Sequence, residues 1–589
     1  MGLFSMSQSL GFAGKIFDSK VTTEPMIELP SFKPQASFAK RNDLPRCAPE
    51  QEGIPSSVIQ GFLETLKEDR TLNMQGITIA RNGKILCEAA FGAQSLDVWQ
   101  YTFSACKSVT SLAIGLLVDD GVLGLGDRVV DIFSKEAGAV GKIKLKDLTV
   151  EDLLTMRSSV FFTELDSIVE EDWLKGFFDA PTKGEIGKTF RYNSLNTYVL
   201  SAIVVAKTGM TLSEFLRQRL FRPLGIRDGD WFWEPCPKGV EKGGWGLYIR
   251  PDDFVKLAQL VMQKGIWDGI RLISEEYITA ATFPHVNVTM ESTRFNYGYQ
   301  IWVGKETDTF LFNGLFGQNV LGFRRNGIVV ISNAGNCELF QQSNFFKYVV
   351  EFFDRDFDCF CKPNKPAAQA LTKYVRSLSD YSPMPWYKKL LMVSRRAKEK
   401  RVIESIVGKK YGCFEGSPNA VGLLPLILQA VQNRYATGFI GLSFASKKNT
   451  LCLDYEEKGT VTNILLGTEF PIVQTITLGD IPFLVAAKAK ITRDEDERTV
   501  IVIRIDFLEY PSSRIIKLVF LDRDTILMRS EEMPGDELAN EAIDLVFDEI
   551  PDTPLISGVI DKIGSDYFVF KAAQAMSPRL LLKRSKYQE

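Results

Sequence analysis

The sequence predicts an α+β domain, whose sheet combines distant parts of the chain, followed by a second, antiparallel β domain. Strand-like runs precede and follow a long helical region in residues 46–355, which is the order expected of an α+β domain. After residue 400, short β-prone runs alternate with turn signals. The length of 589 residues also exceeds one ordinary core, so two large domains are expected.

The first domain is expected at residues 46–355, after a polar, proline-interrupted arm at residues 1–45. Residues 58–66 have the apolar spacing of an amphipathic helix. Residues 76–80 and 85–90 are predicted to form a hairpin, because Asn82-Gly83 between them suits a type I′ turn. A helix is predicted from about 107 to 119, and Gly121 is placed to end it.

Helical signals then dominate residues 150–220, with helices predicted at 195–207 and 212–220. Strand signals return at residues 297–303, 310–312, 319–323 and 327–333. Because these strands lie far along the chain from the first hairpin, the sheet is expected to combine distant segments.

A linker that includes a helix is predicted at residues 356–400, and a C-terminal β domain at residues 401–589. The basic run SRRAKEKR in the linker suits either a polyanion-binding patch or a solvated helix face. In the C-terminal domain, β-prone runs fall at 438–445, 450–455, 461–466, 499–507 and 515–521. An antiparallel barrel or sandwich accounts for this pattern.

The composition limits which binding partners and which cellular location are expected. A net charge of −3 gives no reason to expect a nucleic acid or an anionic membrane as a partner. No apolar run approaches the roughly 18 residues that span a bilayer, and the first residues lack the basic region of a signal peptide. Nine cysteines without a framework spacing are typical of free thiols in a reducing cytoplasm, so a cytoplasmic location is expected. The oligomeric state is left open.

The histidine count constrains the chemistry most strongly. The chain has one histidine, His285, which follows Pro284 on a predicted loop where a structural role is expected. A histidine-rich metal site is therefore excluded, and no G-x-S-x-G segment supplies the serine of a histidine-based triad. Any nucleophilic chemistry is expected to use another base, with no metal or cofactor.

The candidate nucleophile is Ser104, in the segment FSACKSVTSLAIGLLVDDG. If a helix begins at or just before Ser104, Lys107 lies three residues later on the same face. The positive end of the helix favours a neutral amine, which could accept the serine proton. Ser37 and Lys40 repeat the spacing in the polar arm, where no apolar helix follows, and we interpret that copy as chance.

With these motifs in place, the sequence resembles the serine β-lactamase and penicillin-binding-protein superfamily. The nearest branch is the class C-like one, with family VIII carboxylesterases, D-aminopeptidases and 6-aminohexanoate-oligomer hydrolases. The resemblance runs from about residue 49 to residue 353 and rests on ordered matches along the chain. The matching segments are Phe103–Ser108, Asp119–Asp127, Leu148–Met156, Phe190–Ser194, Arg222–Ile226, Gly244–Tyr248, Trp267–Gly269 and Tyr297–Trp302.

The resemblance implies a β-lactamase-like fold for residues 46–355, which is an antiparallel sheet flanked by helices with a helical subdomain. It also implies roles for further residues. Tyr192-Asn-Ser194 matches the family's Tyr-x-Ser motif, which makes Tyr192 a proton-transfer group beside Lys107 and Ser194 a substrate-binding residue. Relatives also use appended β domains to wall the mouth of the site, which is a hypothesis for residues 401–589.

The family's third motif departs from its usual form. Where many members carry Lys-Thr-Gly or His-x-Gly, this chain has FNGLFGQ, with Phe312, Asn313 and Gly314 as the expected substrate-binding residues. The resemblance implies an oxyanion hole formed by the backbone N–H groups of Ser104 and Leu315. Because the cation is missing, recognition of a β-lactam carboxylate is not expected.

The sequence therefore predicts a serine hydrolase that acts on a small ester or amide through an acyl-enzyme. An acyltransferase or D-amino-acid peptidase using the same site remains an alternative, as does a non-catalytic binding protein on this fold. The acidic loop at residues 161–182 either recognises a substrate amine or is a solvated helix of charged residues.

Overall fold

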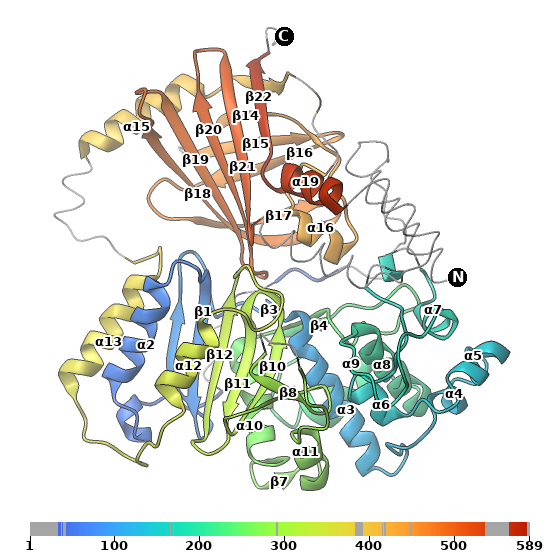
Figure 1. Ribbon diagram of the computed structural model, residues 1–589. Helices are drawn as coiled ribbons and strands as arrows, with labels where there is room; N and C mark the ends of the chain where they lie inside the picture. The colour runs from blue at the N-terminus through green and yellow to red at the C-terminus, as the bar shows by residue number, and fades with distance from the viewer. Residues whose placement is uncertain are drawn as a thin grey trace.

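The computed structural model describes residues 33–36, 38, 43–164, 166–168, 170–289, 293–382, 393–414, 416, 420–447, 450–535 and 565–585. These residues form a unit of mixed helices and strands and a second unit dominated by one sheet (Figure 1). The predicted α+β domain followed by an antiparallel β domain is confirmed. Most of the N-terminal arm, including Ser37 and Lys40, lies outside the described residues.

The first unit is built on a seven-stranded antiparallel sheet with the order β2-β1-β12-β11-β10-β9-β8. Its strands are β1 (Met74–Arg81), β2 (Lys84–Ala90), β8 (Phe295–Tyr297), β9 (Trp302–Gly304), β10 (Thr309–Gly314), β11 (Gln318–Phe323) and β12 (Ile328–Ala334). Asn82 and Gly83 have φ of 50° and 79°, as a type I′ turn requires. The pairing of β1 with β12 confirms that the sheet joins distant segments.

Alternation along the central strands produces two separate cores. On β12, Val329 and Ile331 belong to one apolar cluster, whereas Ile328 and Val330 belong to another. This follows from the two-residue period of a strand, which sends neighbouring side chains to opposite faces of the sheet. Both faces are therefore covered by helices.

The helices of the first unit occupy both faces of the sheet and the subdomain beside it (Figure 1). They are α2 (Ser56–Glu68), α3 (Cys106–Asp119), α4 (Val129–Ile132), α5 (Gly138–Lys144), α6 (Val150–Leu154), α7 (Trp173–Asp179), α8 (Ser194–Thr208), α9 (Leu212–Leu216) with the continuing π-helical turn η4 (Arg217–Phe221), α10 (Pro251–Met262), α11 (Glu275–Ala281), α12 (Phe345–Phe353) and α13 (Lys365–Leu378). The face against α2 and α12 is rich in phenylalanine, and α13, from the predicted linker, packs on α2.

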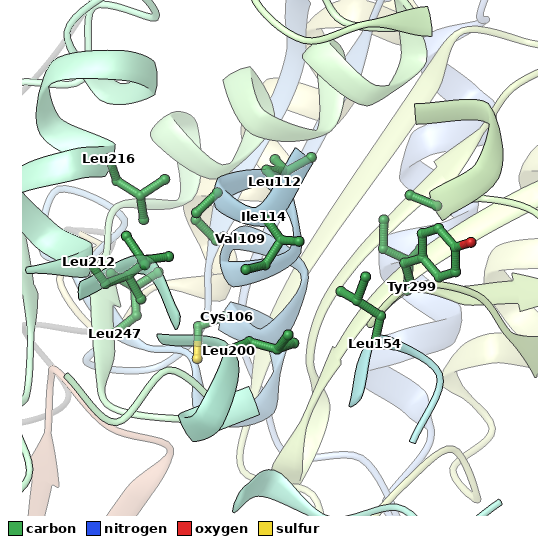
Figure 2. Packing of buried hydrophobic residues seen from close by; sticks show 14 of the residues in the cluster. Cys106, Val109, Leu112, Ile114, Leu154, Leu200, Leu212, Leu216, Leu247 and Tyr299 are labelled. Atoms are coloured by element: carbon green, nitrogen blue, oxygen red, sulfur yellow. The ribbon is translucent and has the colours of Figure 1, made fainter. Parts of the chain in front are cut away.

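Helix α3 runs through the core that contains Val329 and Ile331. Figure 2 shows Cys106, Val109 and Ile114 on α3 between leucines of the helical subdomain on one side and Leu154 with Tyr299 on the other. Nearly every side chain of α3 is buried, because it is covered by α8, α9, α11 and the sheet. The start of α3 is thereby fixed in position.

The second unit is a ten-stranded antiparallel sheet with the order β16-β15-β14-β13-β22-β21-β20-β19-β18-β17. Its strands are β13 (Lys410–Cys413), β14 (Phe439–Lys447), β15 (Thr450–Glu457), β16 (Thr460–Leu466), β17 (Ile472–Leu478), β18 (Ile481–Arg493), β19 (Thr499–Phe507), β20 (Ser512–Phe520), β21 (Thr525–Met533) and β22 (Arg579–Arg584). The end strands β16 and β17 meet where the Gln474 amide donates to Leu465 O at 2.7 Å and accepts from Leu465 N at 2.8 Å. The sequence predicts either a barrel or a sandwich for this unit, and the sheet forms a nearly closed barrel.

Among the described residues, three helices accompany the barrel: α15 (Val393–Ile406) before it, α16 (Leu426–Gln432) between β13 and β14, and α19 (Ser565–Met576) before β22. In the part of the chain that the structure describes, no single helix is long and apolar enough to cross a membrane. Helix α8 and the α9–η4 segment meet that test only together, as a pair bent by 72°.

One predicted strand is wrong. Residues 297–303 form the end of β8, a turn and the start of β9, because Gln300 has φ of 57° and cannot continue a strand. The buried Gln300 amide donates to Leu153 O at 2.9 Å and Leu154 O at 3.0 Å. A Cβ at Gly298 would lie 2.2 Å from Ala281 O. These tertiary contacts outweigh the local strand preference.

His285 lies where a structural role was expected. Its ring stacks on Tyr299, with centroids 4.3 Å apart and planes 6° apart, and Nε2 lies 2.9 Å from Ala280 O.

Candidate active site

Ser104 lies where a short strand turns into helix α3. Strand β3 (Gln100–Tyr101) pairs with β5 (Leu247–Ile249), and the 3-10 turn η2 (Phe103–Ala105) leads into α3. Phe103 has φ of 47°, a left-handed conformation that costs a bulky residue roughly 1–3 kcal/mol. Its ring makes edge-to-face contacts with Tyr101 and Phe316, at 4.7 and 4.9 Å between centroids. These contacts hold the residue that precedes Ser104.

Lys107 lies next to Ser104, as the three-residue spacing predicts. Its Nζ donates to Ser104 Oγ at 2.8 Å, to Ser194 Oγ at 2.9 Å and to Gly244 O at 2.8 Å. All three partners are uncharged oxygens, and the side chain is 1% exposed. Burial lowers the pKa of Lys107 to about 8, although nearby acidic groups, including Glu164, act in the opposite direction. A proton on this amine can therefore exchange close to neutral pH.

Tyr192 lies beside Lys107 and Ser104. Lys107 Nζ lies 4.9 Å from the centroid of the Tyr192 ring, which stacks on Trp302 and meets Phe340 edge to face. Burial raises the pKa of the Tyr192 hydroxyl above its ordinary value, and the contact with the Ser104 hydroxyl opposes that shift. Since burial moves the two pKa values in opposite directions, the phenol stays protonated at a pH where Lys107 can lose its proton.

Ser194 is brought to the site by the start of α8. Asn193 caps this helix, because its side-chain oxygen accepts from Leu195 N at 2.8 Å. Ser194 is the first helical residue, and its backbone N–H donates to Glu164 Oε1 at 3.3 Å. The Tyr-x-Ser segment therefore meets Lys107 from the other side of the site.

Glycine at position 314 is required by a close backbone approach. A Cβ there would lie 2.2 Å from Thr102 O, two residues before Ser104. The end of β10 can therefore press against the turn that carries Ser104. The resemblance implies a substrate-binding role for Gly314, whereas the contact seen in the structure is a packing contact with the backbone before Ser104.

The other third-motif residues divide between the site and the core. Leu315 borders the same cavity as Ser104. Phe312 is fully buried and packs against Phe254, with centroids 6.3 Å apart, and Asn313 donates to Asn319 Oδ1 at 2.7 Å within the sheet. The structure thus brings Leu315 to Ser104 but leaves Phe312, Asn313 and Gly314 outside the cavity lining.

The cavity beside Ser104 has a volume of about 320 Å³. Residues of both units line it: Phe103, Ser104, Glu164, Ser167, Trp173, Ser194, Pro237, Lys242, Trp245 and Leu315 from the first, and Ile427, Ala430, Val431 and Asn433 from the second. Part of the acidic loop therefore reaches the site, as does helix α16. Among the described residues, no cluster of three or more His, Cys, Asp or Glu is placed to hold a metal.

Residues 61–334 match the family model described as Beta-lactamase. They form a β-lactamase-family domain. The chain is 28% identical to penicillin-binding protein 4 of Amycolatopsis lactamdurans over 205 residues, which cover 29% of this chain and 53% of that protein. It is 23% identical to 6-aminohexanoate-dimer hydrolase of Paenarthrobacter ureafaciens over 281 residues, which cover 43% of this chain and 70% of that protein. The chain thus spans about half the length of the first relative.

Among solved structures, D-amino acid amidase of Ochrobactrum anthropi is 16% identical, with a TM-score of 0.40, covering 54% of this chain and 99% of that one. A penicillin-binding-protein homologue from Caulobacter crescentus is 19% identical, with a TM-score of 0.41, covering 50% and 93%.

A buried polar cluster joins the β-lactamase-family domain to the barrel. Glu234 accepts from Lys242 Nζ at 2.7 Å, from Tyr248 OH at 2.7 Å and from the Gln432 amide at 2.8 Å. The Tyr248 and Tyr510 hydroxyls lie 2.6 Å apart. Because Gln432 and Tyr510 come from the barrel, the two units share one hydrogen-bonded core at the side of the cavity.

Helix α16 is also held from inside the barrel. The Leu426 N–H at its start donates to both carboxylate oxygens of Glu532, at 2.9 and 3.0 Å. Glu532 is in turn paired with Arg514 at 2.8 Å, and both side chains are buried. With Glu532 at one end and Gln432 at the other, α16 is fixed at both ends.

A second barrel segment supports the strand behind Ser104. In the β19–β20 turn, residues 508–511, the backbone oxygen of Glu509 accepts a hydrogen bond from Tyr101 N at 2.9 Å. The Glu509 carboxylate accepts from Trp99 Nε1 at 2.6 Å, Lys33 Nζ at 2.7 Å and Leu484 N at 3.0 Å. Strand β3 is therefore fixed to the barrel three residues before Ser104.

Sequence reasoning missed Glu234, Lys242 and Gln432, since nothing local marks their contacts across the two units. The signal that could have helped is the pair Gly243-Gly244. Cβ atoms there would lie 2.7 Å from Thr197 O and Ser194 O, so glycines alone let this segment press on α8. That approach delivers Gly244 O to Lys107.

Proposed function

We propose that this protein is a serine hydrolase that cleaves an ester or amide bond through an acyl-enzyme on Ser104. The observation that carries the proposal is the Lys107 amine, buried within 2.8 Å of Ser104 Oγ with its pKa lowered to about 8. A serine hydroxyl beside a neutral amine is an activated nucleophile that needs no histidine. The β-lactamase-family domain and the similarity to a 6-aminohexanoate-dimer hydrolase support this assignment.

In the acylation step, Ser104 Oγ attacks the substrate carbonyl carbon and passes its proton to the neutral Lys107 amine. The carbonyl electrons move to oxygen, where the backbone N–H groups of Ser104 and Leu315 would stabilise the negative charge. The bond to the leaving group then breaks. The departing oxygen or nitrogen takes a proton from Tyr192, which regains one from the Lys107 ammonium.

Deacylation repeats these transfers with water. A water molecule attacks the ester carbonyl of the acyl-enzyme and gives its proton to the Lys107–Tyr192 pair. The bond to Ser104 Oγ breaks, the serine regains a proton and the acid is released. An acyltransferase would differ only in that an alcohol or amine replaces water, and a D-amino-acid peptidase only in the acyl group.

The direct test is labelling with a fluorophosphonate probe together with hydrolysis of p-nitrophenyl acetate. We expect the wild type to be labelled and Ser104→Ala to be unlabelled, with the exposed-site variant Ser446→Ala as the control. Lys107→Met and Tyr192→Phe should each lower kcat at least a hundredfold. Equal labelling of wild type and Ser104→Ala would refute the assignment, and failure of wild type with several probes would favour a non-catalytic protein.

The rate should also depend on pH with a defined sign. Lys107 acts as the base only when neutral, so kcat/KM should rise with pH and reach half its maximum near pH 8. Below that pH the rate should fall about tenfold per unit, as one protonation predicts. A rate that fell with rising pH across this range would contradict Lys107 as the base.

We also propose a cytoplasmic location. All nine cysteines are free of disulfides, as expected of a protein kept in a reducing compartment. Fractionation of the native cell would test this, since recovery outside the cytoplasm would contradict it.

A further inference from the structure

We infer that the cavity beside Ser104 binds an uncharged, apolar group of the substrate, and that helix α16 of the barrel sets the size of that group. This inference rests on the proposed function, because it names the substrate class for the same site.

The cavity walls are mainly hydrocarbon and aromatic surface. Trp173 and Trp245 stack with centroids 5.4 Å apart and planes 23° apart, and both line the cavity. Leu315 contributes beside Ser104, and Ile427 and Val431 of α16 contribute from the barrel. A cavity of about 320 Å³ with such walls suits an aromatic ring or a medium-length alkyl chain.

The lining gives little opportunity to bind an anion. Among the described residues that line this cavity, Lys242 is the only lysine or arginine. Its ammonium lies 2.7 Å from Glu234 Oε2, and the two side chains are 4% and 7% exposed. A substrate carboxylate would have to displace Glu234, whose other oxygen is held by Tyr248 and Gln432. Removing one partner from a buried ion pair is costly.

A cationic group is also disfavoured. The carboxylate that lines the cavity is Glu164, whose residue is exposed to solvent and whose Oε1 already accepts from Ser194 N. An ammonium in the cavity would lose hydration among tryptophan and aliphatic side chains, and no buried carboxylate among the described lining residues would replace that hydration. An uncharged group avoids both costs.

Helix α16 is suited to limit the size of the bound group. Glu532 holds its first N–H group, and Gln432 ties its last turn to Glu234 and Tyr248. The wall that it presents is therefore fixed rather than adaptable. Ala430 is an exposed small residue on this wall, so a larger side chain there would enter the cavity without disturbing the core.

The experiment compares kcat/KM for p-nitrophenyl esters of acetate, butyrate and octanoate with octanoate analogues ending in a carboxylate or an amine. We expect the neutral octanoate to exceed both charged analogues at least tenfold. Ala430→Trp should lower the octanoate-to-acetate ratio at least tenfold, whereas Ala139→Trp, at an exposed helix site of α5, should not. A parallel series of acetate esters with longer alcohols shows whether the cavity holds the acyl or the alcohol side.

Glu234→Gln provides the matching charge test. This variant frees the Lys242 ammonium, so the carboxylate analogue should gain at least tenfold relative to neutral octanoate. Charged analogues as good as the neutral ester, or Ala430→Trp with an unchanged ratio in both series, would overturn the inference.

The two proposals fail in different ways. Absence of fluorophosphonate labelling removes the proposed function, but binding of octanamide to Ser104→Ala can still be measured by calorimetry. That binding should weaken at least tenfold in Ser104→Ala combined with Ala430→Trp. No binding, or binding unaffected by Ala430→Trp, would overturn the assignment of the cavity alone.

Discussion

The barrel meets the β-lactamase-family domain through two segments of opposite character. Helix α16 presents Ile427 and Val431 to the cavity in front of Ser104. The 508–511 turn presents backbone oxygens and the Glu509 carboxylate to strand β3 behind Ser104. One segment supplies a surface that a substrate can touch, and the other supplies contacts that no substrate can reach.

The two segments are therefore expected to have different roles. Helix α16 determines which substrates are preferred, and the 508–511 turn holds Ser104 in position. A change in α16 should alter the relative rates of substrates that do or do not fill the cavity. A change in the turn should affect every substrate alike, because Tyr101 and Phe103 connect it to Ser104. Two substitutions test this separation of roles, and a third tests the charge at the rim of the cavity.

The largest effect is expected from Glu509→Ala. It leaves the buried Lys33 ammonium and the Trp99 N–H without their carboxylate partner, which should cost roughly 3–5 kcal/mol of unfolding free energy. Chemical denaturation measures this loss. Initial rates on acetate and octanoate esters, corrected for the folded fraction, should fall by the same factor.

The double variant Lys33→Met, Glu509→Gln is the control for this prediction. It removes both charges but keeps an amide oxygen for Trp99, so much of the lost stability should return. A fall confined to the octanoate ester in Glu509→Ala would show that the turn influences selectivity and would break the separation.

A smaller effect is expected from Gln432→Leu at the end of α16. The change removes hydrogen bonds to Glu234, Tyr248 and Tyr510, at a cost of about 1–3 kcal/mol, while preserving most of the side-chain volume. Because α16 is then held at one end only, the preference between acyl chain lengths should broaden while acetate hydrolysis changes little. A uniform loss on all esters would instead assign α16 a supporting role.

The smallest effect is expected from Glu164→Gln. The Glu164 charge favours protonated Lys107, so its removal should lower the pKa of Lys107 further. The midpoint of the pH–rate profile should therefore move to lower pH, by less than about one unit because Glu164 is exposed and screened by solvent. Glu170→Gln in the same loop is the comparison, and a shift to higher pH would contradict the sign.

Local spacing explains which parts of the site could be predicted from the sequence. Ser104 and Lys107 are three residues apart at a helix start, so their contact follows from helix geometry. Tyr192 and Ser194 were placed only through a resemblance, because their approach to Lys107 depends on how α8 packs on α3. The roles of these four residues in the reaction remain predictions.

The misplaced features were those decided by tertiary contact. Phe312 faces the core rather than the cavity because side chains alternate along β10. The hairpin at Gln300 is fixed by hydrogen bonds to residues more than a hundred positions away in the chain. The α16 wall depends on Glu532 and Gln432, which no short motif connects.

Residues 33–36 lie at the seam between the two halves of the molecule. Lys33 is paired with Glu509, and Gln35 donates to Thr475 on the barrel at 3.0 Å. A gene divided after residue 400 would therefore separate a buried lysine from its carboxylate, and the β-lactamase-family fragment would also lose a wall of its own cavity. The two halves are expected to be inherited together rather than exchanged as modules.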